Sequence, residues 1–323
     1  MFILSVMRTI LISIMFCGIA LSSVPAADYN LRATANSNEN DEDYDGLVVF
    51  KNYVESASNG AISVELFIGT QLCSKGAECL QGVADGSIDI YISTSGGAAG
   101  IFPYVQVLDL PYLMSSDRVA EHVLAGDFTR KIRELALADS KGKIRLMTIG
   151  NTGGWRNFAN TRRRITQPSD MKGLKIRTVV ADLPQELVRS LGASPTPIPW
   201  PELFTSFQTG VVEGSKNGIT DIMNMKFPDA GLKYVTLDGH AYMGALWWMS
   251  NAKFSSMPES MRRVVVDGFV ALQQATLPRL SESQLKHMKI LLQEVETCMF
   301  LHLHKKPASR KQLHQFISGS SPM

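Results

Sequence analysis

Short apolar segments with the twofold period of a strand alternate, over the first third of the chain, with longer segments whose apolar residues recur at helical spacing. Strands are predicted at 29–36, 61–69 and 88–94, and helices at 45–60 and 76–87. The order strand, helix, strand, helix, strand is typical of a parallel sheet covered by helices. The pattern therefore predicts an α/β fold.

The rest of the chain continues this mixture. Strands are predicted at 143–150, 173–180 and 242–251, and helices at 117–126, 183–192 and 201–210. A further helical pattern extends from Pro258 to about Thr297, with a break expected at Pro278. Residues 151–172 are rich in Gly, Asn and Thr, which predicts a loop that crosses from a first lobe to a second.

The N-terminus has the layout of a secretory signal peptide. Arg8 precedes an apolar segment from Ile10 to Leu21, and the small residues that follow place the cleavage site after Ala26. A retained membrane anchor is the alternative, but the apolar segment is short for a bilayer span of about 20 residues. We therefore expect residues 1–26 to be removed and the protein to be periplasmic.

Charge and cysteine usage narrow the class of protein. The net charge of +2 favours neither nucleic acid nor an anionic membrane as a partner. Cys73 and Cys79 are six residues apart, a separation compatible with a disulfide in an oxidising compartment, although two free buried thiols are the alternative. No spacing of cysteines or histidines typical of a metal site is present, and we expect no cofactor.

Two local motifs have competing interpretations. The sequence DEDYDG, residues 41–46, matches the start of an EF-hand calcium loop, but its twelfth position is Asn52 instead of Glu. Acidic residues ahead of a helix also interact favourably with the helix dipole. The sequence SGGAAG, residues 95–100, lacks the lysine of a phosphate-binding loop and is predicted to be a tight turn. No serine elbow or histidine constellation predicts a catalytic residue, so we expect no enzyme.

Polar side chains near the ends of predicted strands suggest a binding cleft. Arg177 lies near the end of strand 173–180, and Asn36 and Thr94 follow two first-lobe strands. Ligands of α/β sheets bind beyond the carboxyl ends of the strands, where Arg156 and Asn217 in predicted loops are also expected. The planar guanidinium of arginine matches a carboxylate with two parallel hydrogen bonds. The alternative is that Arg177 pairs with a carboxylate of the protein itself.

Residues 170–218, with the sequence DMKGLKIRTVVADLPQELVRSLGASPTPIPWPELFTSFQTGVVEGSKNG, closely resemble the signature region of a known family. It is the family of DctP-type solute-binding proteins of tripartite ATP-independent periplasmic (TRAP) transporters. Residues 62–96, 107–114 and 153–177 follow the same family in order. The resemblance covers roughly residues 27–297, and the segment beyond about Thr297 departs from the family's closing strand and helices.

The resemblance implies a two-lobed periplasmic-binding-protein-like fold. Each lobe is a sheet flanked by helices, and crossing strands and a long helix join the two. Lobe I is expected at 27–154, completed by about 243–282. Lobe II is expected at 155–242, completed by about 283–323, where the tail is atypical.

The resemblance also assigns roles to residues in the cleft. Arg177 is expected to hold the ligand carboxylate, with Arg156 as a second anchor. Asn217 ends the sequence GVVEGSKN, where the family has GVVDGQEN, and Trp200 is expected as an aromatic wall. The first-lobe contacts implied by the resemblance are Asn36 and Thr94, and Trp247 is a further candidate unless it belongs to the core.

The implied function is a monomeric, non-enzymatic receptor that delivers a small organic acid to membrane permease subunits of a TRAP transporter. A sulfonate or an acidic sugar is an alternative ligand, because two arginines and an asparagine accept either. A ligand-sensing subunit and a secreted α/β enzyme are alternatives of other classes. We expect no catalytic residue and no metal ligand.

Overall fold

The computed structural model describes residues 27–276 and 298–299. Its central element is one mixed sheet of nine strands. Its strand order is β2-β1-β3-β8-β4-β7-β5-β6, with β9 paired to β8. The strands are β1 Tyr29–Ala35, β2 Ile62–Ile68, β3 Ile90–Thr94, β4 Ile144–Asn160, β5 Lys175–Thr178, β6 Ser194–Pro197, β7 Gly214–Asn217, β8 Tyr234–Ser250 and β9 Cys298–Met299.

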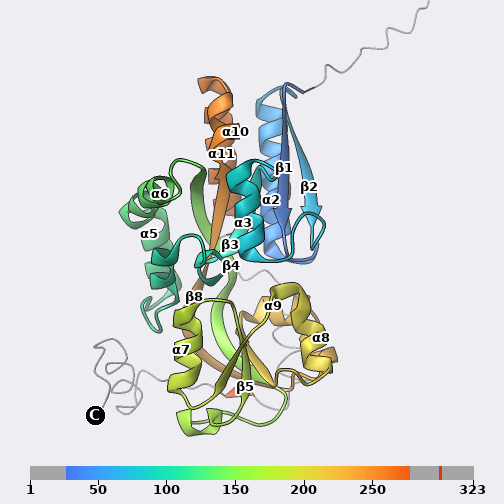
Figure 1. Cartoon of the computed structure of the whole chain (residues 1–323), viewed down its shortest axis with the longest axis vertical. Helices are drawn as coiled ribbons and strands as arrows, with labels where there is room; N and C mark the ends of the chain where they lie inside the picture. The colour runs from blue at the N-terminus through green and yellow to red at the C-terminus, as the bar shows by residue number, and fades with distance from the viewer. Residues whose placement is uncertain (1–26, 277–297, 300–323) are drawn as a thin grey trace, which may run out of the picture.

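Helices pack against the sheet in both its upper and its lower part (Figure 1). The α-helices are α2 Glu42–Ala57, α3 Gly76–Asp85, α4 Ser95–Ala98, α5 Asp117–Ala125, α6 Asp127–Asp139, α7 Asp182–Ser190, α8 Leu203–Gln208, α9 Ile219–Asn224, α10 Asn251–Ser256 and α11 Glu259–Ala275. Short 3-10 helices are η1 Pro103–Asp109, η2 Pro168–Met171, η3 Trp200–Glu202 and η4 Phe227–Ala230. In the described ranges, no helix is both long enough and apolar enough to span a bilayer.

The first lobe is a sheet between two apolar layers. Strands β1, β2 and β3 are parallel, as the strand and helix order predicts, and β8 joins β3 antiparallel. Leu47 and Phe50 of α2 and Phe269 of α11 pack on one face of the sheet. Residues of α3, α5 and α6, among them Leu80 and Ile132, pack on the other face. Since each face is covered, the strands of this lobe are apolar on both sides.

The second lobe has its own two cores. Strands β5, β6 and β7 are parallel to one another, and the antiparallel ends of β4 and β8 complete the sheet. Phe207 and Phe227 lie in a cluster with residues of α8 and α9. Ile176 of β5 packs with Leu187 of α7 on the opposite side. The second lobe therefore has its own helices and cores, and it lies below the first lobe in Figure 1.

Strands β4 and β8, of 17 residues each, pair with one another and pass through both lobes (Figure 1). The prediction of a loop at 151–172 is wrong up to Asn160, because strand pairing with β7 and β8 outweighs the local Gly and Asn content. Gly153 and Gly154 have φ angles of 73° and 69°, and they lie where the β4–β8 register shifts. The crossing is thus an irregular strand at this point.

Three further predictions are corrected or confirmed by the backbone. Residues 95–98 form the one-turn helix α4 and not a tight turn. Helix α2 begins at Glu42, three residues before the predicted start, so the EF-hand loop does not form. A disulfide joins Cys73 and Cys79, whose Cα atoms are 5.3 Å apart, which confirms that prediction. The expected break at Pro278 and the rest of the long helix lie outside the described residues.

Candidate functional site

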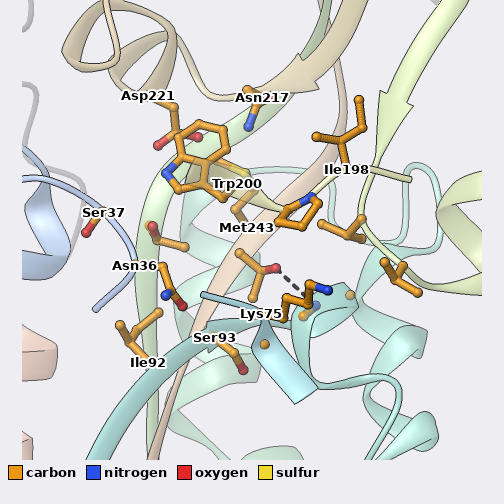
Figure 2. Close-up of a pocket in the computed structure, with 18 of the residues that line it drawn as sticks. Asn36, Ser37, Lys75, Ile92, Ser93, Ile198, Trp200, Asn217, Asp221 and Met243 are labelled. Atoms are coloured by element: carbon orange, nitrogen blue, oxygen red, sulfur yellow. Dashed lines mark hydrogen bonds between the residues drawn. The ribbon is translucent and has the colours of Figure 1, made fainter. Parts of the chain in front are cut away.

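A cleft of about 490 Å³ lies between the two lobes. Its walls are formed by strand ends and adjoining turns of both lobes. Ligand sites of α/β proteins are usually built in this way. Figure 2 shows Asn36, Ser93 and Lys75 on one side, and Asn217, Asp221 and Ile198 on the opposite side. The cleft therefore brings together residues that are far apart in the sequence.

Arg177 of β5 is 4% exposed and lies on the cleft wall. Its Nε donates to the carbonyl oxygen of Ile198 at 2.9 Å, which fixes the plane of the guanidinium. Among the described residues, no carboxylate oxygen lies within 4 Å of its nitrogens, and its two Nη atoms donate to no protein acceptor. Burial, with a smaller contribution from Arg156, lowers the pKa of Arg177 to about 9. Within the described chain, the guanidinium is thus a buried cation whose outer edge has no acceptor.

Arg156 of β4 is a second buried cation on the same wall. Its Nη1 donates to the carbonyl oxygen of Lys216 at 3.1 Å, and its Nε lies 3.8 Å from Oδ1 of Asp109. Both Arg156 and Asn217 lie in strands and not in loops as predicted, because β4 and β7 pair at Asn157 and Asn217. Pairing in the sheet holds these two side chains at the crossing of the lobes.

Trp200 in η3 also lines the cleft. Its ring lies 5.6 Å from the guanidinium carbon of Arg177 and 5.5 Å from the ring of Phe227, edge to face. Packing against Phe227 fixes the indole, so that it covers the buried cation. Figure 2 shows the indole in the cleft close to Asn217 in projection.

The polar groups of Asn36, Thr94 and Asn217 all lie on the cleft wall but already have protein partners. Asn36 donates to the carbonyl oxygen of Cys73 at 2.8 Å and accepts from the hydroxyl of Tyr91 at 2.7 Å. Thr94 Oγ1 accepts from the Gly97 amide at 3.3 Å and caps α4. Asn217 accepts from the hydroxyl of Ser215. The hydrogen bonds of Asn36 and Thr94 therefore fix the local structure of the cleft wall.

Trp247 is the one predicted site residue that the structure places away from the cleft. It is fully buried in the first-lobe core, near Gly46 of α2 and Gly150 of β4. Neighbouring residues of a strand point to opposite faces. Trp248 accordingly lies in the other core and donates to the Ser93 hydroxyl at 2.8 Å. Both tryptophans are packing residues.

Acidic residues on the cleft wall were not predicted as ligand contacts. Asp41, Asp43 and Asp221 line the cleft and are buried. Carboxylate oxygens of Asp41, Glu42 and Asp221 lie within 4.8 Å of one another. Asp41 caps α2 by accepting from the Asp43 amide at 3.0 Å, and Asp221 accepts from the Gly218 amide at 3.2 Å. The sequence signal for Asp41 and Asp43 was the motif DEDYDG, and Asp221 had none.

Burial controls the protonation of this acidic group. It raises the pKa of Asp41 and of Asp43 well above the usual range, and neighbouring carboxylates add to the effect. Burial and Glu42 raise the pKa of Asp221 to about 7, although Arg156 opposes the shift. The cleft therefore combines buried arginines with buried carboxyl groups whose pKa values are raised, that of Asp221 to about 7.

Several known proteins resemble this chain in sequence or in fold. The chain is 30% identical over 254 residues to a solute-binding protein of Verminephrobacter eiseniae, covering 79% of this chain and 73% of the relative. It is 27% identical over 261 residues to the 2,3-diketo-L-gulonate-binding periplasmic protein of Escherichia coli, covering 80% and 78%. A TRAP periplasmic solute-binding protein of Polaromonas, solved with D-erythronate, has the same fold with a TM-score of 0.82 at 23% identity, covering 90% and 93%.

The family comparison extends further than the resemblance did. The model for the bacterial extracellular solute-binding proteins of family 7 matches residues 33–316, and so includes most of the segment beyond Thr297 that we expected to lie outside the family. The prediction of a two-lobed α/β fold is confirmed by the solved relative. The chain belongs to the DctP family of bacterial extracellular solute-binding proteins, which are binding proteins and not enzymes.

Proposed function

We propose that this protein is a periplasmic receptor that binds a small organic acid between its lobes and delivers it to the permease subunits of a TRAP transporter. Family membership supports the role in solute capture. The E. coli relative binds 2,3-diketo-L-gulonate and the Polaromonas relative was solved with D-erythronate, and both ligands are carboxylic acids. The receptor acts as a monomer, and residues 1–26 direct its export and are then removed.

The observation that carries this proposal is the unpaired guanidinium of Arg177. Its Nε is held by Ile198, its face is covered by Trp200, and within the described chain it has no carboxylate partner. A ligand carboxylate supplies the missing negative charge through two parallel hydrogen bonds. Closure of the lobes removes water and strengthens this charge pairing. Differential affinity for the closed state then drives the movement of the lobes.

Substitution of Arg177 tests the proposal. Calorimetry with D-erythronate should show that Arg177→Ala weakens binding by at least about 100-fold, since two charge-assisted hydrogen bonds are lost. Arg177→Lys keeps the charge but not the planar fork, so we expect an intermediate loss. Arg189→Ala removes an exposed arginine on α7 that pairs with Glu186, and should leave binding unchanged.

Thermal unfolding of each variant confirms that the fold is retained. An Arg177→Ala protein that is folded and binds organic acids as tightly as the wild type would contradict the proposed function.

A further inference from the structure

A turn closed by a disulfide forms part of the first-lobe wall of the cleft. The bond between Cys73 and Cys79 encloses residues 74–78, and residues 74–77 all line the cleft. Both cysteines are buried, at 4% and 0% exposure. The cleft therefore has a wall segment whose shape is held by a covalent bond.

Hydrogen bonds fix the same turn to its surroundings. Asn36 donates to the carbonyl oxygen of Cys73 at 2.8 Å, and its Oδ1 lies 3.5 Å from Sγ of Cys79. The carboxylate of Glu78 accepts from the Lys75 amide at 3.3 Å. The backbone at Lys75 is thus held by the disulfide and by a capping carboxylate of its own turn.

Lys75 carries a positive charge into the cleft from this turn. It lines the cleft, and Figure 2 shows it on the first-lobe side. It forms no ion pair with any residue in the described ranges. Arg177, on the second-lobe side, also lacks a carboxylate partner there. Two cations, one from each lobe, therefore face the same cleft without a protein carboxylate to neutralise them.

Close contacts bring the turn near the strand that carries Arg177. A Cβ on Gly76 would lie 2.6 Å from the carbonyl oxygen of Gly97 in α4, and a Cβ on Gly96 would lie 2.3 Å from Cγ2 of Val179. Val179 follows Arg177 by two residues, and both line the cleft. Through α4, the turn therefore reaches the end of β5.

A single carboxylate can accept hydrogen bonds from both cations. Its two oxygens offer about four lone-pair positions, and a guanidinium that binds with two parallel bonds uses two of them. An ammonium group is a compact charge with three donors on a flexible stem, so it can bind at a remaining position. Contacts from opposite lobes to one anion favour the closed form, because only that form makes both.

We infer that Lys75 is the first-lobe contact of the ligand carboxylate, and that the disulfide between Cys73 and Cys79 positions it. This inference rests on the proposed function, because it takes the same carboxylate to be bound by Arg177. Arg177 binds the anion to the second lobe, and Lys75 links it to the first. Tight binding therefore requires an intact disulfide, which an oxidising compartment maintains.

Calorimetry with D-erythronate tests both parts of the inference. Lys75→Met keeps the apolar stem and removes the charge, and should weaken binding about tenfold, the effect of one charged hydrogen bond. Cys73→Ala combined with Cys79→Ala removes the disulfide and should weaken binding to a similar extent. Lys143→Met is the matched control and should bind as the wild type does, because Lys143 is an exposed first-lobe lysine that does not line the cleft.

A protein with all three substitutions separates positioning from a general effect on the site. If the disulfide acts through Lys75, this protein should bind no more weakly than the variant that lacks the disulfide alone. Losses that multiply to about 100-fold would mean that the disulfide acts by another route, and would overturn its positioning role. Wild-type affinity in the variant without the disulfide would overturn that role too, and wild-type affinity in Lys75→Met would overturn the ligand contact.

Glu78→Ala provides the test if the cysteine variant does not fold. It removes the carboxylate that accepts from the Lys75 amide while the disulfide stays intact. Binding of D-erythronate should weaken about threefold, the effect of one lost cap, but should not weaken further when Lys75→Met is also present. Thermal unfolding without ligand checks that each variant is folded. A further loss in the combined variant would contradict the positioning of Lys75 by this turn.

The outcomes also separate this inference from the proposed function. If Arg177→Ala abolishes binding but Lys75→Met changes nothing, the receptor function stands and the first-lobe contact is wrong. If Arg177→Ala changes nothing, the proposed function itself fails.

Discussion

A buried arginine without a protein carboxylate is unfavourable in the empty receptor, and Arg177 illustrates this at the scale of a single residue. Its environment lowers the pKa of the guanidinium, chiefly through desolvation. An anion that enters the cleft removes part of this penalty because it supplies the opposite charge. In the proposed function, the burial that disfavours the isolated guanidinium therefore favours the binding of an anion.

Lys216 is a third buried basic residue, and its charge affects stability. Burial, followed by Arg156, lowers its pKa from 10.5 to about 7. Between these two values the unfolded chain binds a proton that the folded protein does not, so the free energy of unfolding rises with pH over this range. Below about pH 7 the lysine is protonated in both states, and the penalty for burying its charge is fully present.

Substitution of this lysine should remove that pH dependence. Chemical denaturation should show that Lys216→Met is more stable than the wild type at pH 6, and that the difference shrinks by pH 10. Lys175→Met, on the neighbouring strand β5, removes an exposed lysine and should give no such pH-dependent gain. A stability difference for Lys216→Met that is equal at pH 6 and pH 10 would contradict this account.

At the scale of single residues, the arginines of the cleft could be predicted from the sequence, whereas its carboxyl groups could not. Arg177 stands out because an arginine in an apolar strand needs a partner, and the family resemblance gave it a role. Asp41 and Asp43 were ambiguous, because acidic residues at a helix start are common for reasons of the helix dipole. Asp221 lies in the short helix α9, and its proximity to Asp41 and Glu42, which are about 180 positions away in the sequence, arises only from the tertiary structure.

At the scale of elements, the fold was predictable wherever local pattern and tertiary pairing agreed. The strands and helices from β1 to β3 begin and end within three residues of the predicted bounds. The crossing strand β4 was not predictable, because its Gly and Asn residues favour a loop and only pairing with β7 and β8 makes it a strand. The choice between Trp247 and Trp248 was equally open, since a shift of one residue exchanges the faces of a strand.

Gly153 is the point where the crossing strands leave no room for a side chain. A Cβ there would lie 2.1 Å from Met243 and 2.6 Å from a carboxylate oxygen of Asp221. A Cβ on Gly218 would lie 1.8 Å from the carbonyl oxygen of Gly153. The crossing therefore depends on close contact between two backbone segments, one from each of β4 and the start of α9.

Two adjacent glycines allow a matched test of this contact. Gly153→Ala should lower the unfolding free energy by about 2–4 kcal/mol, from a strained positive φ together with overpacking. Gly154→Ala, with a similar φ but no atom within 4 Å of the added Cβ, should cost only about 1–2 kcal/mol. Equal losses for both variants in denaturant titrations would show that the close contact has no separate effect.

At the scale of the whole molecule, hydrogen bonds join the two lobes beside the cleft. Gln106 of η1 accepts a hydrogen bond from the Leu183 amide in the first turn of α7 at 3.1 Å. On another side, Asn38 donates to the carbonyl oxygen of Asn224 at 3.4 Å. Neither Gln106 nor Leu183 lines the cleft. Their hydrogen bond therefore joins the lobes without lining the cleft.

Loss of the Gln106 contact should weaken the binding of every ligand by the same factor, because apparent affinity falls with the population of the closed state. We expect Gln106→Ala to bind D-erythronate and succinate each about 2- to 10-fold more weakly, the effect of one hydrogen bond. Gln81→Ala, an exposed glutamine on α3, is the control and should change neither affinity. Small-angle scattering should show that Gln106→Ala needs more ligand than the wild type to reach the compact form. A change in the ratio of the two affinities would mean that Gln106 acts on the ligand itself and not on closure.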